Sequence, residues 1–309
     1  AIIMPYSKSS TLSIDEHVYL NEDSKSSEVV VENDKEAFID LVGKGLTKIE
    51  EGVFNKVVLS RKEKVQLGEI DPIHYFKVLL NSYNNALVYC WYHPSVGLWL
   101  GATPELLLDV KGHSFSTMAL AGTQLYEGTL DVKWNAKEQQ EQQFVTDYIE
   151  SEILEYTMNV NVYEPATVRA GHVLHLKTDI KGEIRPESES FRKLLLAIHP
   201  TPAVCGMPKV EAMQFILDYE GYNREFYTGF LGELNKEMKI EKRANAEDVV
   251  LPEGEKRASH LFVNLRCMQL NKNEAFVYVG CGITKDSIPE QEWNETVNKT
   301  KTIKRVIAF

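Results

Sequence analysis

The sequence predicts a mixed α/β fold, an α+β arrangement of strands and helices in one large domain. Apolar, β-branched runs indicate strands at residues 55–61, 261–266 and 276–283. Apolar residues at helical spacing indicate helices at residues 34–52 and 137–158. No repeat, low-complexity tract or compositional break divides the 309 residues, so we expect a single domain.

The composition excludes several classes of partner. A net charge of −11 argues against a nucleic acid or an anionic membrane surface, and an anionic substrate would need specific local cations. Cys90, Cys205, Cys267 and Cys281 lie far apart without zinc-binding spacing, which is typical of core residues in a reducing compartment. No apolar run approaches the roughly 18 residues of a membrane span. Residues 1–5 do not begin a secretory signal, so we expect a cytoplasmic protein.

The first helix follows a polar segment. Residues 1–35 become polar after a short apolar start, and we expect either a partly exposed loop or the end of a longer N-terminal portion. The helix over 34–52 ends at Gly52. The strand at 55–61 has three consecutive apolar residues, so both its faces should be buried. Lys56 begins this strand, and an edge charge that reaches solvent is the commoner alternative for it.

A second helix and a hairpin come next. Asp71 and Pro72 form an N-cap and first-turn pair. Residues 87–100 are rich in aromatic residues and broken at 94–97, which predicts a hairpin. Glu105 follows, between a Gly/Pro turn and a triple-Leu strand. Burial there would raise its carboxyl pKa and supply a general acid, whereas a turn residue facing water is an equally good interpretation.

Residues 137–158 are predicted to be the longest helix. Its apolar stripe includes Val145 and Ile149, and Glu141 continues this stripe one turn earlier as a carboxylate. An acid on the core side of a helix needs a cation or a metal as partner. Residues 118–123 before it read as a strand that ends in a glycine.

The last third of the chain contains three segments whose residues bear on a possible site. A proline-punctuated loop at 198–209 suits the wall of a binding site, although His199 taken alone is more often structural. Residues 234–259 are highly charged and should form an exposed loop or hairpin. Arg266 falls inside the apolar pattern of 261–266, where a buried arginine usually meets a carboxylate.

The last predicted strand and the helix after it form the most informative pair. Gly280 and Gly282 end the strand, where glycine lets the backbone approach a ligand. On the helix, Glu292, Glu295 and Lys299 share one face. These features predict an anion-plus-metal site, although such a stripe is usually a solvated helix face.

Eight short motifs follow one another from about residue 56 to residue 299. In chain order they are KVVLSR (56–61), GATPE (101–105), LAGT (120–123), KxxxE (137–141), HPTPAVCGMP (199–208), RExYxG (224–229), GxGI (280–283) and EWxETxxK (292–299). Each is weak alone, but the ordered set resembles the chorismate-utilising enzymes, and within them most closely isochorismate synthase. The resemblance implies one chorismate-binding catalytic domain over 1–309, with an extensive, mostly antiparallel sheet core flanked by helices. It also implies a monomer with one deep site for Mg²⁺ and chorismate.

Roles follow by position within this resemblance. Lys56 matches the general base that activates water for attack at ring C2, and Glu105 matches the general acid that protonates the departing C4 hydroxyl. The implied Mg²⁺ ligands are Glu141 and Glu295, with Glu138 and Glu292 as nearby acids acting through water. The implied substrate-binding residues are Gly122, Thr123, His199, Ala203, Tyr227, Arg266, Gly280, Gly282 and Lys299.

The chemistry agrees with these roles. Hydroxide is a poor leaving group, so the C4 oxygen needs a proton from a neutral acid, and water needs an uncharged base. Burial disfavours the charged form of both groups. Mg²⁺ prefers oxygen ligands and keeps waters, and Arg266 can bind a carboxylate through two hydrogen bonds.

Three positions indicate the branch of the family. Anthranilate synthases usually carry Gln where Lys56 stands, and the aminodeoxychorismate branch usually carries Lys where Ala121 stands. Salicylate synthases usually carry Thr at the position of Ala203. Gln139 and Gln142 depart from the Arg and His usual beside the metal glutamate, which puts a supporting role for that His in doubt.

Two alternatives stay open beside isochorismate synthase. One is a salicylate synthase that also eliminates pyruvate. The other is an inactive relative that binds a ligand or acts as a scaffold. Whether the product serves menaquinone or siderophore synthesis is open.

Overall fold

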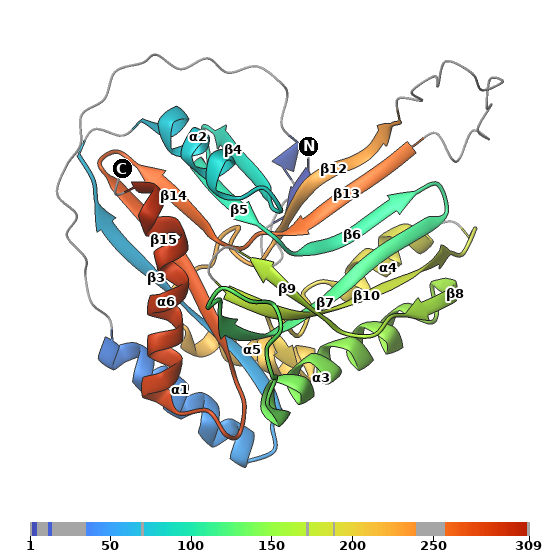
Figure 1. Ribbon diagram of the computed structural model, residues 1–309, viewed down its shortest axis with the longest axis horizontal. Helices are drawn as coiled ribbons and strands as arrows, with labels where there is room; N and C mark the ends of the chain where they lie inside the picture. Colours follow the sequence, from blue (N-terminus) through green and yellow to red (C-terminus); the bar gives the residue numbers. More distant parts are fainter. Residues whose placement is uncertain are drawn as a thin grey trace.

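Two antiparallel sheets form the body of the protein (Figure 1). The computed structural model describes residues 2–4, 12–13, 35–68, 71–170, 173–187, 189–238 and 257–307. The nine-stranded sheet has the order β2 (Leu12–Ser13), β1 (Ile2–Met4), β12 (Phe230–Glu237), β13 (Arg257–Val263), β6 (Leu106–Lys111), β7 (Ser114–Leu125), β10 (Val173–Ile184) and β8 (Thr157–Val162), with β9 (Ala166–Ala170) also paired to β10. The six-stranded sheet has the order β11 (Gly206–Met207), β3 (Lys56–Gln66), β15 (Glu274–Ile283), β14 (Cys267–Asn271), β5 (Gly97–Thr103) and β4 (Leu87–His93).

Helices flank both sheets, as the sequence predicts for this fold class. They are α1 (Lys35–Glu50), α2 (Pro72–Ser82), α3 (Ala136–Ile153), α4 (Ser190–Ile198), α5 (Lys209–Tyr219) and α6 (Pro289–Ile307). Helix α3 packs on β7 and β10 of the larger sheet and on α4. Helices α1, α5 and α6 pack on β3 and β15 of the smaller sheet, and α2 packs on β4 and β5. The predicted mixed α/β domain with mostly antiparallel sheets is confirmed.

Local signals place several elements correctly. Helix α1 ends at Glu50, two residues before the predicted end, and Gly52 beyond it has a φ of 73°, which glycine adopts without strain. The Asp71 side chain accepts a hydrogen bond from the His74 amide at 2.9 Å and so caps α2. The first six residues of β3 are all buried, so the expectation of a strand covered on both faces is also confirmed.

The end of helix α3 and the order of helix lengths differ from the prediction. Helix α3 ends at Ile153 because the chain turns into β8 at Thr157, although the apolar stripe continues to Tyr156. Among the described residues, the longest helix is therefore α6, with 19 residues, and not α3.

Two expected loop segments lie partly outside the described residues. Of 1–35, the structure describes Lys35 and the backbone of β1 and β2. Of 234–259, residues 239–256 lie outside the described part. The ends of this segment belong to β12 and β13, which pair in antiparallel register up to Glu237 and Arg257.

The chain crosses between the sheets at two adjacent places. Strand β5 of the smaller sheet continues into β6 of the larger one through residues 104–105, and β13 continues into β14 through residues 264–266. The crossings run side by side, since Phe262 pairs with Leu106 in one sheet and Cys267 pairs with Gly101 in the other. Arg266 therefore lies in a turn after β13 with a φ of 49°, and not inside a strand as predicted. This seam is where the candidate site is found.

Candidate active site

A cavity of about 180 Å³ lies between the two sheets. Strands β3 and β15 line it from one sheet, strands β7 and β10 line it from the other, and both crossings contribute to its wall. The predicted site residues that line it are Lys56, Glu105, Gly122, Thr123, Glu138, Glu141, Ala203, Tyr227, Arg266, Gly280, Gly282, Glu295 and Lys299. The structure thus brings most of the predicted set to one place.

Lys56 begins β3 and points into this cavity. Its residue is 1% exposed, and its Nζ donates a hydrogen bond to Glu141 Oε1 at 2.7 Å. Glu141 comes from α3, which belongs to the layer on the other sheet. The expectation that Glu141 needs a cation or metal as partner is met here by an amine.

Gly282 makes room for this ion pair. A Cβ at Gly282 would lie 2.9 Å from Lys56 Cε and 3.0 Å from Glu141 Oε1. A Cβ at Gly280 would instead lie 2.8 Å from the Leu59 carbonyl oxygen and 3.1 Å from the Tyr227 hydroxyl. Both glycines are therefore required by protein groups beside the cavity.

Glu105 is buried in the first crossing. Burial raises the pKa of its carboxyl to about 7, although Arg266, Lys56 and Lys299 each lower it. Its backbone is fixed by the Val263 amide, which donates to the Glu105 carbonyl at 2.9 Å. Of the two interpretations open from the sequence, the buried carboxyl is correct, and it exchanges a proton near neutral pH.

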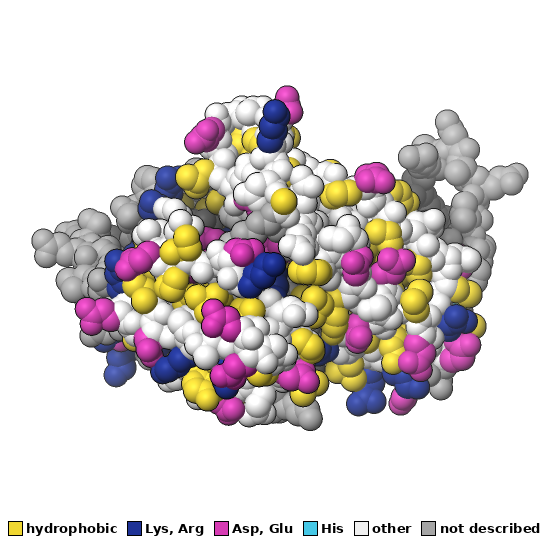
Figure 2. All heavy atoms as spheres, turned by 90° about the horizontal axis from the view of Figure 1, so that it is seen from below, with side chains coloured by type: hydrophobic (Ala, Val, Ile, Leu, Met, Phe, Trp, Pro, Cys, Tyr) yellow, Lys and Arg dark blue, Asp and Glu magenta, His cyan; other side chains and the backbone are white. Residues whose placement is uncertain are grey.

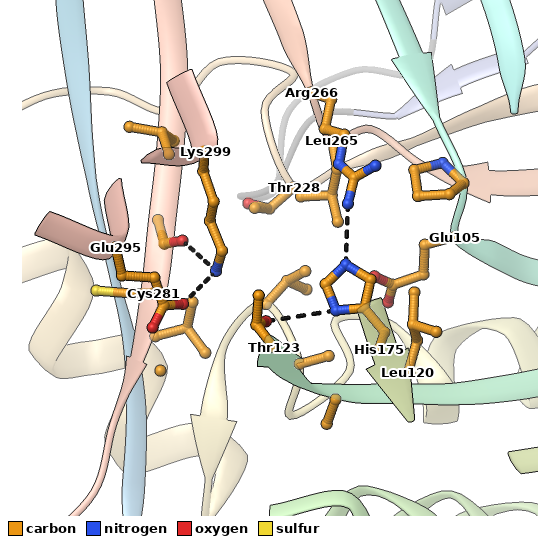
Figure 3. A pocket seen from close by; sticks show the side chains of 18 of the residues that line it. Glu105, Leu120, Thr123, His175, Thr228, Leu265, Arg266, Cys281, Glu295 and Lys299 are labelled. Carbon is orange, nitrogen blue, oxygen red and sulfur yellow. Dashed lines mark hydrogen bonds and ion pairs between the residues drawn. The ribbon is translucent and has the colours of Figure 1, made fainter. Parts of the chain in front are cut away.

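Arg266 and His175 form a linked pair on one wall (Figure 3). Arg266 Nη2 lies 2.9 Å from His175 Nε2, and His175 Nδ1 lies 2.8 Å from the Gly122 carbonyl oxygen. Burial, followed by the charge of Arg266, lowers the pKa of His175 to about 3, so its imidazole is neutral. Because arginine only donates and a carbonyl only accepts, His175 carries its proton on Nδ1. The imidazole therefore orients the guanidinium of Arg266.

Lys299 and Glu295 face this pair from α6 (Figure 3). Lys299 Nζ lies 2.6 Å from Glu295 Oε1 and donates to the Gly280 carbonyl oxygen at 3.1 Å. Burial lowers the pKa of Lys299, but Glu295, Cys281 and Glu141 together outweigh burial, so the net pKa is raised. Lys299 is thus a fixed cation in the cavity wall.

Glu138 lines the cavity but also caps α3. Its Oε2 accepts from the Asn135 amide at 2.9 Å, and Asn135 Oδ1 accepts from the Glu138 amide at 3.1 Å, which forms a capping box. One of its carboxylate oxygens therefore already accepts a hydrogen bond in the helix cap.

The cavity holds both signs of charge, as does the surface. Three lysine and arginine side chains and four glutamates line it, so the cations needed by an anionic ligand are local, as the net charge of −11 requires. Figure 2 shows acidic and basic side chains interspersed over one face of the molecule. Among the described residues, no group of three or more His, Cys, Asp or Glu side chains has the spacing of a metal site.

A family model described as "Chorismate binding enzyme" matches residues 6–243 and 254–308. The chain belongs to this family. A curated relative named "Salicylate biosynthesis isochorismate synthase", from Pseudomonas aeruginosa, is 28% identical over 279 residues, with 86% of this chain and 54% of the relative covered. "Anthranilate synthase component 1" of Aquifex aeolicus is 29% identical over 285 residues, with 88% and 53% covered.

Comparison with a solved structure supports the same family assignment. A putative 2,3-dihydroxybenzoate-specific isochorismate synthase from Bacillus anthracis superposes with a TM-score of 0.80 at 25% identity, covering 99% of this chain and 82% of that one. The chain spans about half the length of the first two curated relatives. None of the helices in the described ranges could cross a membrane.

His199 does not line the cavity. Helix α4 ends at Ile198, and the His199 ring packs edge-on against Phe230 at 5.0 Å between centroids. Burial lowers the pKa of His199 to about 3. The loop beyond it delivers Ala203 and Val204 to the cavity instead.

Glu292 also stays outside the cavity. It is buried in the first turn of α6, next to Cys281, whose Sγ lies 3.7 Å from the Glu292 carbonyl oxygen. Helical spacing places Glu292 on the same face as Lys299, but two turns earlier, beyond the end of the cavity.

Gln142 supports the site from behind, whereas His175 lines the cavity. Gln142, where the family usually has His, is buried and donates to the Ala119 carbonyl and to Thr178 Oγ1, both at 3.0 Å. Gln142 thus ties α3 to the larger sheet. His175 is the functional candidate that sequence reasoning missed, and its signal was an imidazole inside the apolar run Val-Leu-His-Leu.

A buried ion pair fixes part of the cavity wall. Arg224 donates from Nε and Nη2 to the Glu220 carboxylate at 2.6 and 2.7 Å. The same guanidinium donates to the carbonyl oxygens of Val58 at 2.7 Å and Val204 at 2.9 Å, and both valines line the cavity. The Ser60 amide also donates to Glu220 at 2.6 Å. The pair thus joins β3, α5 and the loop after α4.

Proposed function

We propose that this protein is an isochorismate synthase that converts chorismate reversibly to isochorismate with Mg²⁺. Water would attack ring C2 while the C4 hydroxyl leaves. The observation that carries the proposal is Lys56 and Glu105 in one cavity, a buried amine and a carboxyl with a pKa of about 7. The names of the relatives from Pseudomonas and Bacillus support the same activity.

Glu105 supplies the acid. With a pKa of about 7, a large fraction of this carboxyl holds its proton at neutral pH. That proton converts the departing C4 hydroxyl to water, a far better leaving group than hydroxide. Its backbone is fixed in the crossing, which supports a defined position for the acid.

Lys56 supplies the base for the attacking water. Its amine is buried and held by Glu141, so its position on the cavity wall is defined. To accept a proton from the attacking water the amine must first be uncharged.

The substrate carboxylates need cations that are already in place. Arg266 is oriented by His175, and Lys299 is held by Glu295 and the Gly280 carbonyl oxygen. Tyr227 adds a buried hydroxyl near Gly280. Two fixed cations across one cavity suit a dicarboxylate, and Arg266 suits two-point binding of one of its carboxylates.

The residues present fit a magnesium ion by donor type. Glu141, Glu295 and Glu138 line the cavity with carboxylate oxygens, the ligands that Mg²⁺ prefers. Mg²⁺ keeps several waters and shares substrate oxygens, so two protein carboxylates suffice without a larger cluster. Glu141 and Glu295 would hold the ion, which supplies positive charge against the substrate carboxylate. Glu141 would then contact the ion in place of Lys56, and Glu295 would contact it in place of Lys299.

The test is product analysis. The protein is incubated with chorismate and Mg²⁺, with and without ammonium, and the products are separated and identified by mass and ultraviolet spectrum. We expect isochorismate in both samples. Salicylate with pyruvate would assign a salicylate synthase. Anthranilate in the ammonium sample would assign the activity named for the Aquifex relative. Chorismate binding by calorimetry without turnover would assign an inactive binding protein.

Lys56→Ala and Glu105→Ala complete this test. We expect each to lower kcat by about 10²–10⁴-fold, the usual contribution of a general acid or base. Lys301→Ala, on the exposed side of α6, is the matched control. A folded Lys56 or Glu105 variant with near wild-type turnover would refute the role given to that residue.

A further inference from the structure

Backbone strain gathers at one wall of the cavity. Thr228 has a φ of 61° and Arg266 a φ of 49°, and both residues line the cavity. Glu225, in the same turn as Thr228, has a φ of 51°. Positive φ is uncommon outside glycine and is an outlier for a β-branched residue such as threonine. Such conformations persist only where neighbouring groups enforce them, and they cluster at functional sites.

Asn264 contacts this strained turn at several points. Its amide donates to the Gly229 carbonyl at 2.8 Å, and its carbonyl accepts from the Thr228 amide at 2.9 Å. Its Nδ2 donates to the Phe226 carbonyl at 2.8 Å, and its Oδ1 accepts from the Tyr89 hydroxyl. Asn264 is 1% exposed, so these bonds are made without competition from water. We call these five residues the Asn264 clamp.

Asn264 belongs to the second crossing. Asn264 lies two residues before Arg266 and directly after Val263, whose amide donates to the Glu105 carbonyl. The Arg266 carbonyl accepts from the Ala102 amide at 3.1 Å, which attaches the end of the crossing to the smaller sheet. A change at Asn264 therefore reaches Arg266 through two peptide units.

The position of Tyr89 is also fixed by shape. A Cβ at Gly101 would lie 2.7 Å from the Tyr89 hydroxyl, so the ring of this buried tyrosine lies directly over the glycine. The hydroxyl is thereby aimed at Asn264 Oδ1. An apolar residue at 264 would fill the space but leave the Tyr89 hydroxyl and the Phe226 carbonyl without these bonds.

We propose that Asn264 is a positioning residue. By holding Thr228 and Arg266 in the left-handed backbone region, the Asn264 clamp aims the Arg266 guanidinium at a carboxylate of the bound substrate. The identity of that substrate rests on the proposed function. The clamp itself rests on the contacts above.

Asn264→Ala tests the proposal, with Asn161→Ala as the matched control. Asn161 is an exposed asparagine of β8 whose amide also donates to a backbone carbonyl, at 3.1 Å, and it does not line the cavity. We expect Asn264→Ala to raise KM and the calorimetric Kd for chorismate with Mg²⁺ about tenfold, with a smaller change in kcat. The control should leave all three unchanged.

A rescue separates positioning from general stability. Glycine adopts positive φ without strain, so Thr228→Gly lowers the need for the clamp. We expect the double variant Asn264→Ala/Thr228→Gly to bind chorismate more tightly than additivity of the single changes predicts. Additive losses would contradict the proposal. Tyr89→Phe removes one bond of the clamp and should give an intermediate loss, which keeps the test open if Asn264→Ala does not fold.

Hydrogen exchange distinguishes this proposal from the proposed function. We expect faster amide exchange at Thr228 and Gly229 in Asn264→Ala than in the wild type and in Asn161→Ala. A wild-type protein that does not bind chorismate would refute the proposed function, and the exchange rates would still test the clamp. Unchanged exchange in folded Asn264→Ala would overturn the clamp, whatever the substrate.

Discussion

Glu105 gives the clearest expectation at the scale of a single residue. As a general acid it must carry its proton, and its pKa of about 7 means that the protonated fraction falls as pH rises through neutrality. This ionisation alone lowers kcat/KM about tenfold per pH unit above that pKa, so we expect the pH dependence of kcat/KM to bend downward near pH 7. A pH–rate profile from pH 5 to 9 checks this. A flat profile across that range would contradict the assignment.

The same carboxyl affects stability. Its pKa is raised from 4.5 in a free side chain to about 7 in the fold, so its contribution is fully present below pH 4.5 and is lost as pH rises through 7. Glu105→Gln cannot ionise and avoids this loss. We expect Glu105→Gln to melt at a higher temperature than the wild type at pH 8 and at nearly the same temperature at pH 4.5. Calorimetric scans at both pH values measure it.

Gly282 and Gly280 should differ in the effect of the same substitution. A methyl group at Gly282 meets the flexible ends of Lys56 and Glu141, which can shift, whereas one at Gly280 meets the Leu59 carbonyl. We therefore expect Gly282→Ala to lower kcat/KM about 10²-fold with little loss of stability, because a small misplacement of a catalytic group is costly. Gly280→Ala should chiefly lower the melting temperature. Equal effects of the two variants on activity and melting would refute this distinction.

At the scale of elements, the Glu220–Arg224 pair holds a strand, a helix and a loop together. Both side chains are buried, so removing one charge leaves the other without its partner. We expect Glu220→Gln to lower the free energy of unfolding by about 3–5 kcal/mol. Denaturant titration measures this, and Glu211→Gln on the exposed first turn of α5 is the control.

Elements with local signals were the predictable ones. The cap at Asp71, the glycine after α1 and the apolar run of β3 each act within a few residues, and each was placed correctly. The end of α3 was not, because its apolar stripe runs on to Tyr156 while long-range pairing draws the next residues into β8. Helical periodicity describes a face and does not define where the helix ends.

At the scale of the whole molecule, the two expected metal ligands come from different layers. Glu141 lies on α3, which packs on the larger sheet, and Glu295 lies on α6, which packs on the smaller one. We expect Glu141→Gln and Glu295→Gln each to raise the Mg²⁺ concentration for half-maximal activity at least about tenfold. Glu150→Gln, exposed on α3, is the control. Unchanged metal dependence would count against ligation.

Half of the residues in the cavity wall were predicted, thirteen in all, and twelve of these lie within the ordered motifs, Arg266 being the exception. His199 and Glu292 were misplaced for a geometric reason: a motif gives the sequence position, but not where the cavity stops. His175 was missed because its importance comes from Arg266, 91 residues away in the chain. The two crossings could not be predicted from the sequence either, since they depend on long-range strand pairings such as Phe262 with Leu106.

The interleaved order of the strands limits how this protein can be divided. The smaller sheet takes β3 to β5, β11, β14 and β15, and the larger one takes β1, β2, β6 to β10, β12 and β13. No single cut of the chain can release the two sheets as separate intact pieces. A variant that splits the chain or exchanges one sheet would therefore break at least one sheet. We expect such a variant to lose catalysis completely and not in part.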